Sequence, residues 1–350
     1  MDQATVASGD TFTYAVSGLT GVAEWKPLLD GTTWALGPNY HVTPGETVDV
    51  WPHFTSMKGQ VVTLIAAFQS TALAADGPRA IYAYLPASYA ENTDATYPVV
   101  YMHDGQNLWA ALPALAFSGT WNVDTTFDTA SVLGACSSSS VVGWGAQPLG
   151  GTAVTCNGDG DCPSGSCRTF PEAIVIGVAN TSERIYEYTP TTDPTTAGGG
   201  GADLYVQMLT QELKPVIDGM LRTRPGVAST ALVGSSLGGL VTAYAGLEHP
   251  EVYGLLGEIS PSTWWNNDVI VTDVKTTLAA PARPLTVYVD SGAGTVDDEA
   301  DTDLLAAAYL ALGYVDGTSF RHVIQPGAAH NETYWAEHFP GAMQLLLGVR

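Results

Sequence analysis

Lysine and arginine are scarce in this chain. Its 350 residues include 12 basic and 35 acidic side chains, which gives a formal net charge of −23 at pH 7. Nucleic acids and anionic membrane surfaces are bound mainly through clusters of lysine and arginine. We therefore expect no nucleic-acid partner and no membrane partner.

The sequence also lacks long apolar runs and an export signal. No run approaches the roughly 18 residues that a membrane-spanning helix needs. The opening stretch, Met1-Asp2-Gln3-Ala4-Thr5, has neither a basic nor an apolar region of the kind a signal peptide carries. Hydrophobic residues nevertheless make up 45% of the chain, a normal share for a packed globular protein. The sequence predicts a soluble chain with one large domain and room for a small accessory one.

There are only four cysteines, and all fall within one short stretch. They are Cys136, Cys156, Cys162 and Cys167, and the residues around them are mainly Ser, Gly and Asp. This pattern is typical of two disulfides that cross-link a loop with little hydrophobic core of its own. The pairing stays open. No Cys-x2-Cys pair supports zinc, and the acidic run at 157–161 lacks the bidentate Glu of a calcium loop, so we expect no metal. Oxidised cysteines on an acidic, lysine-poor chain favour a secreted or periplasmic protein whose signal peptide has been removed.

The first 55 residues differ from the rest of the chain. Thr11–Val16, His41–Thr43 and Thr47–Trp51 are short β-prone pieces separated by glycine turns. We therefore interpret residues 1–55 as a β-rich N-terminal extension or accessory module, and residues 56–350 as the catalytic domain.

Three tryptophans stand in this extension. Trp25, Trp34 and Trp51 could form a sugar-binding face. Burial in a small core is the commoner use of tryptophan at such positions, and is what we expect here.

From residue 60 onward, short apolar runs alternate with helical patterns. Such runs, rich in Val and Ile, are what a sheet buried on both faces requires. Expected helices are Asp203–Arg222 with a kink at Pro215, Leu237–Glu248 and Leu304–Leu312. The expected strands are Val61–Ala67, Ala80–Leu85, Pro98–Met102, Ala173–Val178, Ala231–Val233, Leu255–Ile259, Leu285–Val289 and Arg321–Ile324. This alternation predicts an α/β fold with a doubly wound, mostly parallel sheet, interrupted by a cysteine-bearing insertion at about 128–170.

A serine stands at a predicted strand-to-helix turn. Gly234-Ser235-Ser236-Leu237-Gly238 matches Gly-x-Ser-x-Gly, the turn that lifts a nucleophilic serine above an α/β sheet. The motif alone is weak evidence for a nucleophile. Here, however, it lies between an expected strand and an expected helix, which is the position that such a turn requires. We therefore predict that Ser236 is a nucleophile.

A serine nucleophile needs a histidine base, and the base needs a carboxylate to orient it. Of the four histidines after Ser236, His330 follows the last expected strand through a loop, and we predict it to be the base. The acid should follow the preceding strand, where the loop from Asp290 to Glu299 offers many carboxylates. We favour Asp298, with Asp297 as the alternative.

Two backbone N–H groups should form an oxyanion hole. One is expected from Leu237, the residue after the nucleophile. The other is expected from Gly105 or Gln106, in the loop after the strand Pro98–Met102. We interpret His103 and Asp104 in that loop as scaffolding rather than as a second catalytic pair.

At these motifs the chain resembles the putative-esterase branch of the α/β-hydrolases, which includes esterase D, enterochelin esterases, feruloyl esterases and mycolyltransferases. The resemblance runs in order over about residues 58–347. Its motifs are Arg79–Pro86, Tyr97–Trp109, Arg184–Pro190, Gly234–Gly239 and Ser260–Trp265.

This resemblance implies an α/β-hydrolase fold and a serine hydrolase without a cofactor. It implies Ser236 as nucleophile, His330 as base, and Gln106 with Leu237 as oxyanion donors. The family's acid, the second Asp of a Gly-x-Asp-Asp stretch, corresponds to Asp298, although the spacing from the glycine is longer here. The N-terminal extension and the cysteine-bearing insertion are not family features.

The expected activity is that of a secreted serine carboxylesterase. Its substrate would be a small-molecule or polymer ester, such as a feruloyl ester, an acetyl ester or a polyester. Trp264 and Trp265 are expected near the substrate pocket, although either could pack under a loop, and Arg184 could orient an acidic substrate group or pair with Glu187. An acyltransferase of the mycolyltransferase type and a non-catalytic carbohydrate-binding protein are the alternatives. The oligomeric state is left open.

Overall fold

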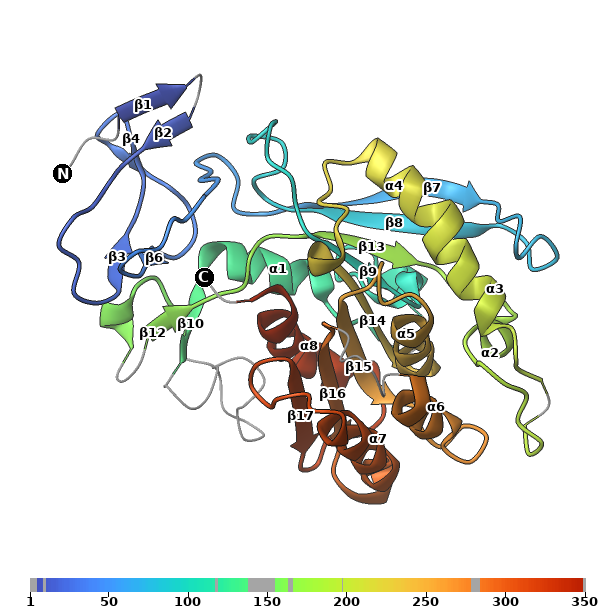
Figure 1. Ribbon diagram of the computed structural model, residues 1–350. Coiled ribbons are helices and arrows are strands. Elements are labelled where there is room, and N and C mark those ends of the chain that lie inside the picture. The colour runs from blue at the N-terminus through green and yellow to red at the C-terminus, as the bar shows by residue number, and fades with distance from the viewer. Residues whose placement is uncertain are drawn as a thin grey trace.

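Eight strands form one central sheet in the order β17-β16-β15-β14-β9-β13-β8-β7 (Figure 1). The computed structural model describes residues 5–8, 11–116, 119–137, 155–162, 166–196, 198–277 and 284–348. The six strands from β17 to β13 run parallel, whereas β8 and β7 are each antiparallel to the preceding strand in this order. The bounds are β7 Gln60–Phe68, β8 Arg79–Leu85, β9 Val99–Met102, β13 Ile174–Val178, β14 Thr230–Ser236, β15 Leu255–Pro261, β16 Thr286–Gly292 and β17 Phe320–Gln325. The predicted mostly parallel sheet is confirmed.

The sheet is covered on both faces because its strands are apolar on both sides. In β9, Val99 and Tyr101 belong to one buried cluster, and Val100 and Met102 belong to the other. Residues of α3 to α7 complete the first cluster, and residues of α1 and α8 complete the second. The helices are α1 Val123–Val132, α2 Arg184–Glu187, α3 Ala202–Gln207, α4 Lys214–Met220, α5 Leu237–Glu248, α6 Val269–Thr277, α7 Glu299–Ala311 and α8 Glu332–Leu347.

The helix expected over Asp203–Arg222 is a composite. Between α3 and α4 lies a π-helical segment, η4 (Met208–Leu213), and Pro215 occupies the first turn of α4. Proline has no N–H to donate and crowds the preceding turn, so the wider π turn accommodates it without ending the helix.

The N-terminal extension forms small two-stranded ribbons outside the main sheet (Figure 1). Their strands are β1 Thr5–Ser8 with β2 Thr11–Thr13, β3 Ala23–Trp25 with β6 Tyr40–Val42, and β4 Leu28–Leu29 with β5 Thr33–Trp34. The strand expected at Thr47–Trp51 is absent, since those residues are irregular. The expected burial of the tryptophans is wrong as well: Trp25, Trp34 and Trp51 are 36%, 54% and 43% exposed.

The extension packs against the cysteine-bearing insertion (Figure 1). There β10 (Gly134–Ser137) pairs with β11 (Thr155–Cys156) and β12 (Ser166–Arg168). Cys156 and Cys167 form a disulfide, and Cys162 is also disulfide-bonded. The side chain of Cys136 and all of residues 138–154, between β10 and β11, lie outside the described residues.

Candidate active site

The chain makes a sharp turn at the predicted nucleophile. β14 ends at Ser236, α5 begins at Leu237, and Ser236 has φ 58° and ψ −126°, a backbone conformation that residues with a Cβ rarely adopt. The glycines of the motif allow the close packing that this turn needs. A Cβ on Gly234 would lie 2.7 Å from the Gly238 carbonyl oxygen, and one on Gly239 would lie 2.9 Å from Pro261 Cα. The local sequence therefore positions the Ser236 hydroxyl at the carboxyl end of the central strand.

A histidine and a carboxylate meet at the carboxyl ends of the neighbouring strands. His330 Nδ1 lies 2.5 Å from Asp297 Oδ1. Asp297 is buried, and its Oδ2 accepts hydrogen bonds from Ser260 Oγ (2.7 Å) and from the Gly292 backbone N–H (2.6 Å). The imidazole is 38% exposed and packs edge-on against Trp335, with 5.0 Å between the ring centroids. The arrangement holds one imidazole nitrogen on a carboxylate and leaves part of the ring open.

Asp298, the favoured acid in the sequence, does not contact His330. It is exposed and adopts a left-handed conformation (φ 51°) at the N-cap of α7. Its carbonyl oxygen accepts from the N–H groups of Asp301 and Thr302, so the residue caps the helix. The structure thus places Asp297, the alternative, and not Asp298 against His330.

Serine residues link the predicted nucleophile, Ser236, to this pair. The Ser236 hydroxyl lies 3.3 Å from Ser262 Oγ, and the Ser262 N–H donates to the Ser236 carbonyl at 2.9 Å. Two residues earlier, Ser260 has a positive φ of 39° and donates to Asp297. The loop after β15 therefore connects Ser236 with Asp297, a connection that the motif Ser260–Trp265 does not reveal from the sequence alone.

A second buried His–Asp pair supports the same loop. His338 Nδ1 lies 3.0 Å from Asp290 Oδ2, and Asp290 Oδ1 accepts from the Ser260 N–H at 2.9 Å. Burial lowers the pKa of His338, but the Asp290 carboxylate outweighs this and the net pKa is raised. Asp290 therefore acts on the site indirectly, by fixing Ser260.

The loop after β9 packs against the nucleophile turn. The His103 N–H donates to the Val233 carbonyl at 3.1 Å, and Gly105 begins a short 3₁₀ turn, η1 (Gly105–Asn107), which contains Gln106. A Cβ on Gly105 would lie 2.4 Å from the Gly177 carbonyl carbon, so this position requires glycine. A Cβ on Gly238, in the first turn of α5, would lie 3.6 Å from Asp104 Oδ2. The two segments expected to supply oxyanion donors, those of Gln106 and Leu237, are therefore neighbours.

Arg184 holds this loop through a two-pronged contact. Its Nε donates to Asp104 Oδ1 at 2.7 Å and its second guanidinium nitrogen donates to Oδ2 at 2.8 Å. Asn180 also binds Asp104 through its side chain, and its N–H donates to Gln106 Oε1 at 3.2 Å. The pairing of Arg184 with Glu187 suggested by the sequence is therefore wrong.

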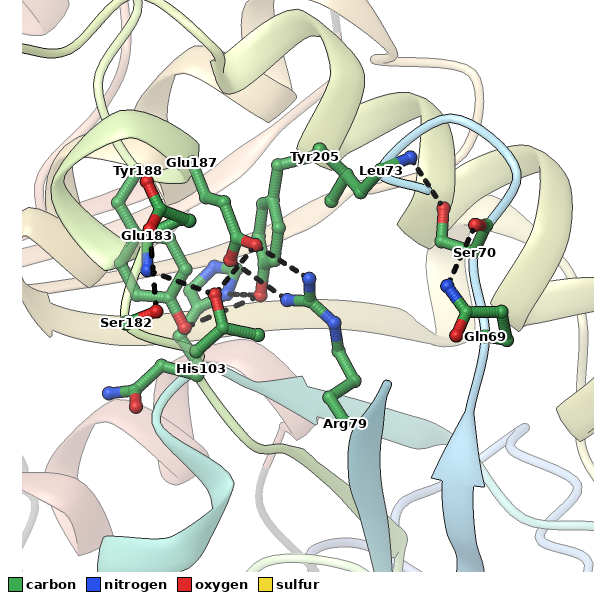
Figure 2. Close-up of polar contacts among 12 residues, drawn as sticks. Gln69, Ser70, Leu73, Arg79, His103, Ser182, Glu183, Glu187, Tyr188 and Tyr205 are labelled. Carbon is green, nitrogen blue, oxygen red and sulfur yellow. Dashed lines mark hydrogen bonds and ion pairs between the residues drawn. The ribbon is translucent and has the colours of Figure 1, made fainter. Parts of the chain in front are cut away.

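Glu187 instead pairs with Arg79 of β8. Two hydrogen bonds of 2.9 and 2.6 Å join the guanidinium to the carboxylate, and both side chains are fully buried (Figure 2). The Thr181 hydroxyl also donates to Glu187, at 3.0 Å. One end of the four-residue helix α2 is thereby anchored to the sheet, while its other end carries Arg184 to the loop.

His103 lies in the packed interior of this loop, as expected for a scaffolding residue. It is completely buried against the rings of Tyr188 and Tyr205, and its Nδ1 lies 2.9 Å from the Tyr205 hydroxyl (Figure 2). Burial lowers its pKa to about 3, so the imidazole is neutral at ordinary pH. A buried, neutral ring of this kind serves to pack the loop.

The structure separates the two expected pocket tryptophans. Trp264 is 40% exposed, two residues after Ser262. Trp265 is 1% exposed and its indole N–H donates to the Thr191 carbonyl at 2.8 Å. Trp264 is therefore partly exposed to solvent, whereas Trp265 packs under the loop.

One group of side chains far from the nucleophile has the composition of a metal site. Glu24, His41 and Asp159 bring their ligand atoms within 4.8 Å of one another. However, Glu24 Oε1 already accepts from the Asp159 N–H, and Asp159 Oδ1 accepts from the Cys167 N–H, at 2.8 and 2.7 Å. We therefore assign these residues to the contact between the N-terminal extension and the insertion.

Glu258, on β15, is a buried carboxyl group that should make the stability of the protein depend on pH. It is fully buried beside the Tyr309 hydroxyl, 2.7 Å away, and burial raises its pKa from 4.5 to about 8. The unfolded chain therefore releases this proton at lower pH than the folded chain, so the group lowers the free energy of unfolding as pH rises from about 4.5 to 8. We expect Glu258→Gln to be more stable than the wild type at pH 9, by on the order of 3–5 kcal/mol, with little difference at pH 4.

Urea unfolding of both proteins at pH 4 and pH 9 measures this difference. The same pH dependence in the two proteins would show that Glu258 does not carry it.

Comparisons with known proteins identify relatives of this chain. A family model described as "Putative esterase" matches residues 164–346, more than half of the chain. An uncharacterized protein YbbA from Bacillus subtilis (strain 168) is 26% identical over 191 residues, covering 52% of this chain and 76% of that protein. A siderophore enterobactin esterase from Emericella nidulans is 29% identical over 110 residues, covering 28% of this chain and 36% of its own.

Solved structures share the fold at low sequence identity. The BES protein from Bacillus cereus superposes with a TM-score of 0.57 at 18% identity, covering 86% of this chain and 99% of its own. A ferulic acid esterase gives 0.55 at 17%, covering 83% and 98%. Within the described residues, no helix is both long and apolar enough to cross a bilayer. The central sheet of the chain is that of an α/β-hydrolase. The matching family model spans both the turn at Ser236 and the loop of His330, and the chain belongs to the Putative esterase family.

Proposed function

We propose that this esterase is a serine carboxylesterase that works through Ser236, His330 and Asp297. The observation that carries the proposal is the 2.5 Å contact between Asp297 and His330 at the sheet edge where β14 presents Ser236. Ser236 ends β14, Asp297 follows β16 and His330 follows β17, so three parallel strands deliver the three side chains to one edge. This order along the chain is that of α/β-hydrolase triads.

The proposed mechanism has two halves. The Ser236 oxygen attacks the ester carbonyl as His330 Nε2 takes its proton, and the tetrahedral oxyanion is held by the N–H groups of Leu237 and Gln106. The intermediate collapses, and the alcohol leaves with the proton from His330. Water then attacks the acyl-enzyme as His330 takes its proton. When this second intermediate collapses, His330 returns the proton to the Ser236 oxygen and the free acid is released. Asp297 keeps the His330 Nδ1 proton in place throughout.

We propose small or aromatic carboxylic esters as substrates, of the feruloyl, acetyl or polyester kind. Trp264 supports this, because an exposed indole close to Ser262 offers a flat apolar surface to an aromatic acyl or alcohol group. The structural neighbours include a ferulic acid esterase, and the sequence relatives include esterases of siderophores. The Cys156–Cys167 disulfide supports a site of action outside the reducing cytosol.

Hydrolysis of p-nitrophenyl butyrate at pH 8 tests the proposed reaction. A phosphonate that labels activated serines should add to the protein once, and mass spectrometry of the digest should find it on Ser236. Methyl ferulate, acetylated xylan and polyester film then define the substrate. Absence of turnover and of labelling would contradict the proposal.

The contact between Arg184 and Asp104 should position the loop that carries Gln106. Arg184→Gln removes the bidentate contact that fixes the loop of Gln106, so the oxyanion donors should lose their alignment. We expect kcat to fall by about 10–100-fold with KM nearly unchanged, since these donors act mainly on the transition state. Arg184→Lys keeps the charge but not the fork and should recover only part of the loss.

Steady-state kinetics of the two variants measures this split. Arg224→Gln, an exposed arginine before β14, is the matched control and should retain wild-type kinetics. A rise in KM with unchanged kcat in Arg184→Gln would mean that Arg184 binds substrate instead.

A further inference from the structure

A pocket of about 370 Å³ lies between the N-terminal extension and the catalytic domain. The extension contributes Tyr40, Glu46 and Trp51 to its lining, and the catalytic domain contributes Arg168 and Arg224. Its volume is within the range of small-molecule sites in proteins. The pocket has no part in the proposed ester hydrolysis.

The pocket lies at the opposite edge of the sheet from Ser236. Pro98, Glu172 and Arg224, which line it, precede β9, β13 and β14. Those are the amino ends of parallel strands, whereas Ser236 and the loops of Asp297 and His330 lie at the carboxyl ends. A ligand bound here would therefore leave the active site free.

Hydrogen bonds hold the two sides of the pocket in place. On one side, the Asn39 N–H donates to the Asn157 carbonyl at 3.0 Å, and His41 Nε2 lies 3.2 Å from Asp159 Oδ1. On the other, the Asn92 side chain donates to the Trp51 carbonyl at 3.1 Å. The site is thus preformed, which lowers the entropic cost of binding.

The lining combines an aromatic surface with both donors and acceptors. Trp51 is 43% exposed despite its fixed backbone. Arg224 is exposed and has no carboxylate partner among the residues that the structure describes, although the chain has 35 acidic side chains. Glu46, Asp49 and Glu172 place carboxylates in the same lining.

This mixture selects the chemistry of the ligand. Arginines disfavour a cation, while the acidic residues and the net charge of −23 disfavour a polyanion. Sugar hydroxyls both donate and accept hydrogen bonds, and the C–H face of a sugar ring can lie on an indole. We propose that the pocket binds a neutral polysaccharide chain, with Trp51 under a sugar ring and Arg224 at its hydroxyl groups. The N-terminal extension is then an accessory module that holds the enzyme on a carbohydrate matrix.

Native gel electrophoresis with neutral polysaccharide in the gel tests this binding without requiring catalysis. Arabinoxylan, mixed-linkage β-glucan and hydroxyethylcellulose are the probes, and polygalacturonate is the anionic comparison. At least one neutral polymer should retard the full-length protein, and polygalacturonate should not. Trp51→Ala should weaken binding about tenfold or more, and Arg224→Gln should weaken it measurably. Trp34→Ala removes a tryptophan of the extension that does not line the pocket, and should bind like the wild type.

Hydrolysis of p-nitrophenyl butyrate by all three variants should equal that of the wild type, which shows that they are folded. Ser236→Ala should be retarded normally, so failure of the esterase proposal and failure of this one remain distinguishable. No retardation by any neutral polymer, or equal loss in Trp34→Ala and Trp51→Ala, would overturn the proposal. So would stronger retardation by polygalacturonate than by the neutral polymers.

Discussion

Replacing Ser236 with alanine is expected to lower kcat for p-nitrophenyl butyrate by about 10⁵-fold or more, because it removes the oxygen that we propose forms the acyl-enzyme. The fold should be preserved. Alanine has the same Cβ as serine and meets the same backbone conformation at φ 58°. Among the described residues, the lost hydroxyl has one hydrogen bond, the 3.3 Å contact with Ser262, worth about 1 kcal/mol or less. Thermal unfolding should therefore differ little from that of the wild type.

Ser262→Ala is the comparison that identifies the nucleophile. Ser262 has the neighbouring hydroxyl, so a preparation in which either serine could attack would lose little activity in each single variant. We expect Ser262→Ala to retain activity within about tenfold of the wild type, since it removes a contact and not the attacking oxygen. Labelling by the phosphonate should persist in Ser262→Ala and vanish in Ser236→Ala. Comparable losses in the two variants would contradict the assignment.

The parts of the site that depend on local geometry could be predicted from the sequence. The Gly-x-Ser-x-Gly turn is determined by a strand, three small residues and a helix that are contiguous in the chain. Close contacts at Gly234 and Gly239 explain why small residues are required there. His330 could be predicted because a single loop after the last strand carries a histidine.

The choice between Asp297 and Asp298 depends on one residue of backbone register. The 3₁₀ turn η6 (Gly294–Val296) and the start of α7 place Asp298 at the helix N-cap and turn Asp297 inward to His330. A signal was available, because a helix beginning at Glu299 makes the preceding aspartate its cap. The Gly-x-Asp-Asp spacing of the family indicated Asp298 instead, but the loop between the glycine and the two aspartates is longer in this chain.

Contacts between distant segments could not be predicted in the same way. Arg184 reaches Asp104, 80 positions away, and Glu187 reaches Arg79, 108 positions away. The spacing of Arg184 and Glu187 in the chain does not indicate which distant side chain each of them contacts. The exposed tryptophans of the extension have a simpler cause, because ribbons of two to four residues per strand cannot enclose a core.

Replacing Asp297 with asparagine is expected to lower kcat by about 10³–10⁴-fold while the protein stays folded. The reason lies in what surrounds the carboxylate. The Gly292 N–H can only donate, so the amide oxygen must occupy the Oδ2 position, where it also accepts from Ser260. The amide NH₂ then faces His330 Nδ1, which can meet it only as an acceptor. The imidazole proton is forced to Nε2, and that nitrogen can no longer take the proton of Ser236.

Asp298→Asn is the matched control, one residue away with the same chemical change. Its side chain is exposed and its capping function uses the backbone carbonyl, so kcat should stay within about twofold of the wild type. Kinetics of the two variants with p-nitrophenyl butyrate, with circular dichroism to check folding, decides between the carboxylates. If Asp298→Asn showed the larger loss, the acid would be Asp298 and the loop would have to rearrange when substrate binds. If Asp297→Asn lost its activity and Asp298→Asn kept it, the 2.5 Å contact between Asp297 and His330 would be the contact that sets the tautomer of the base.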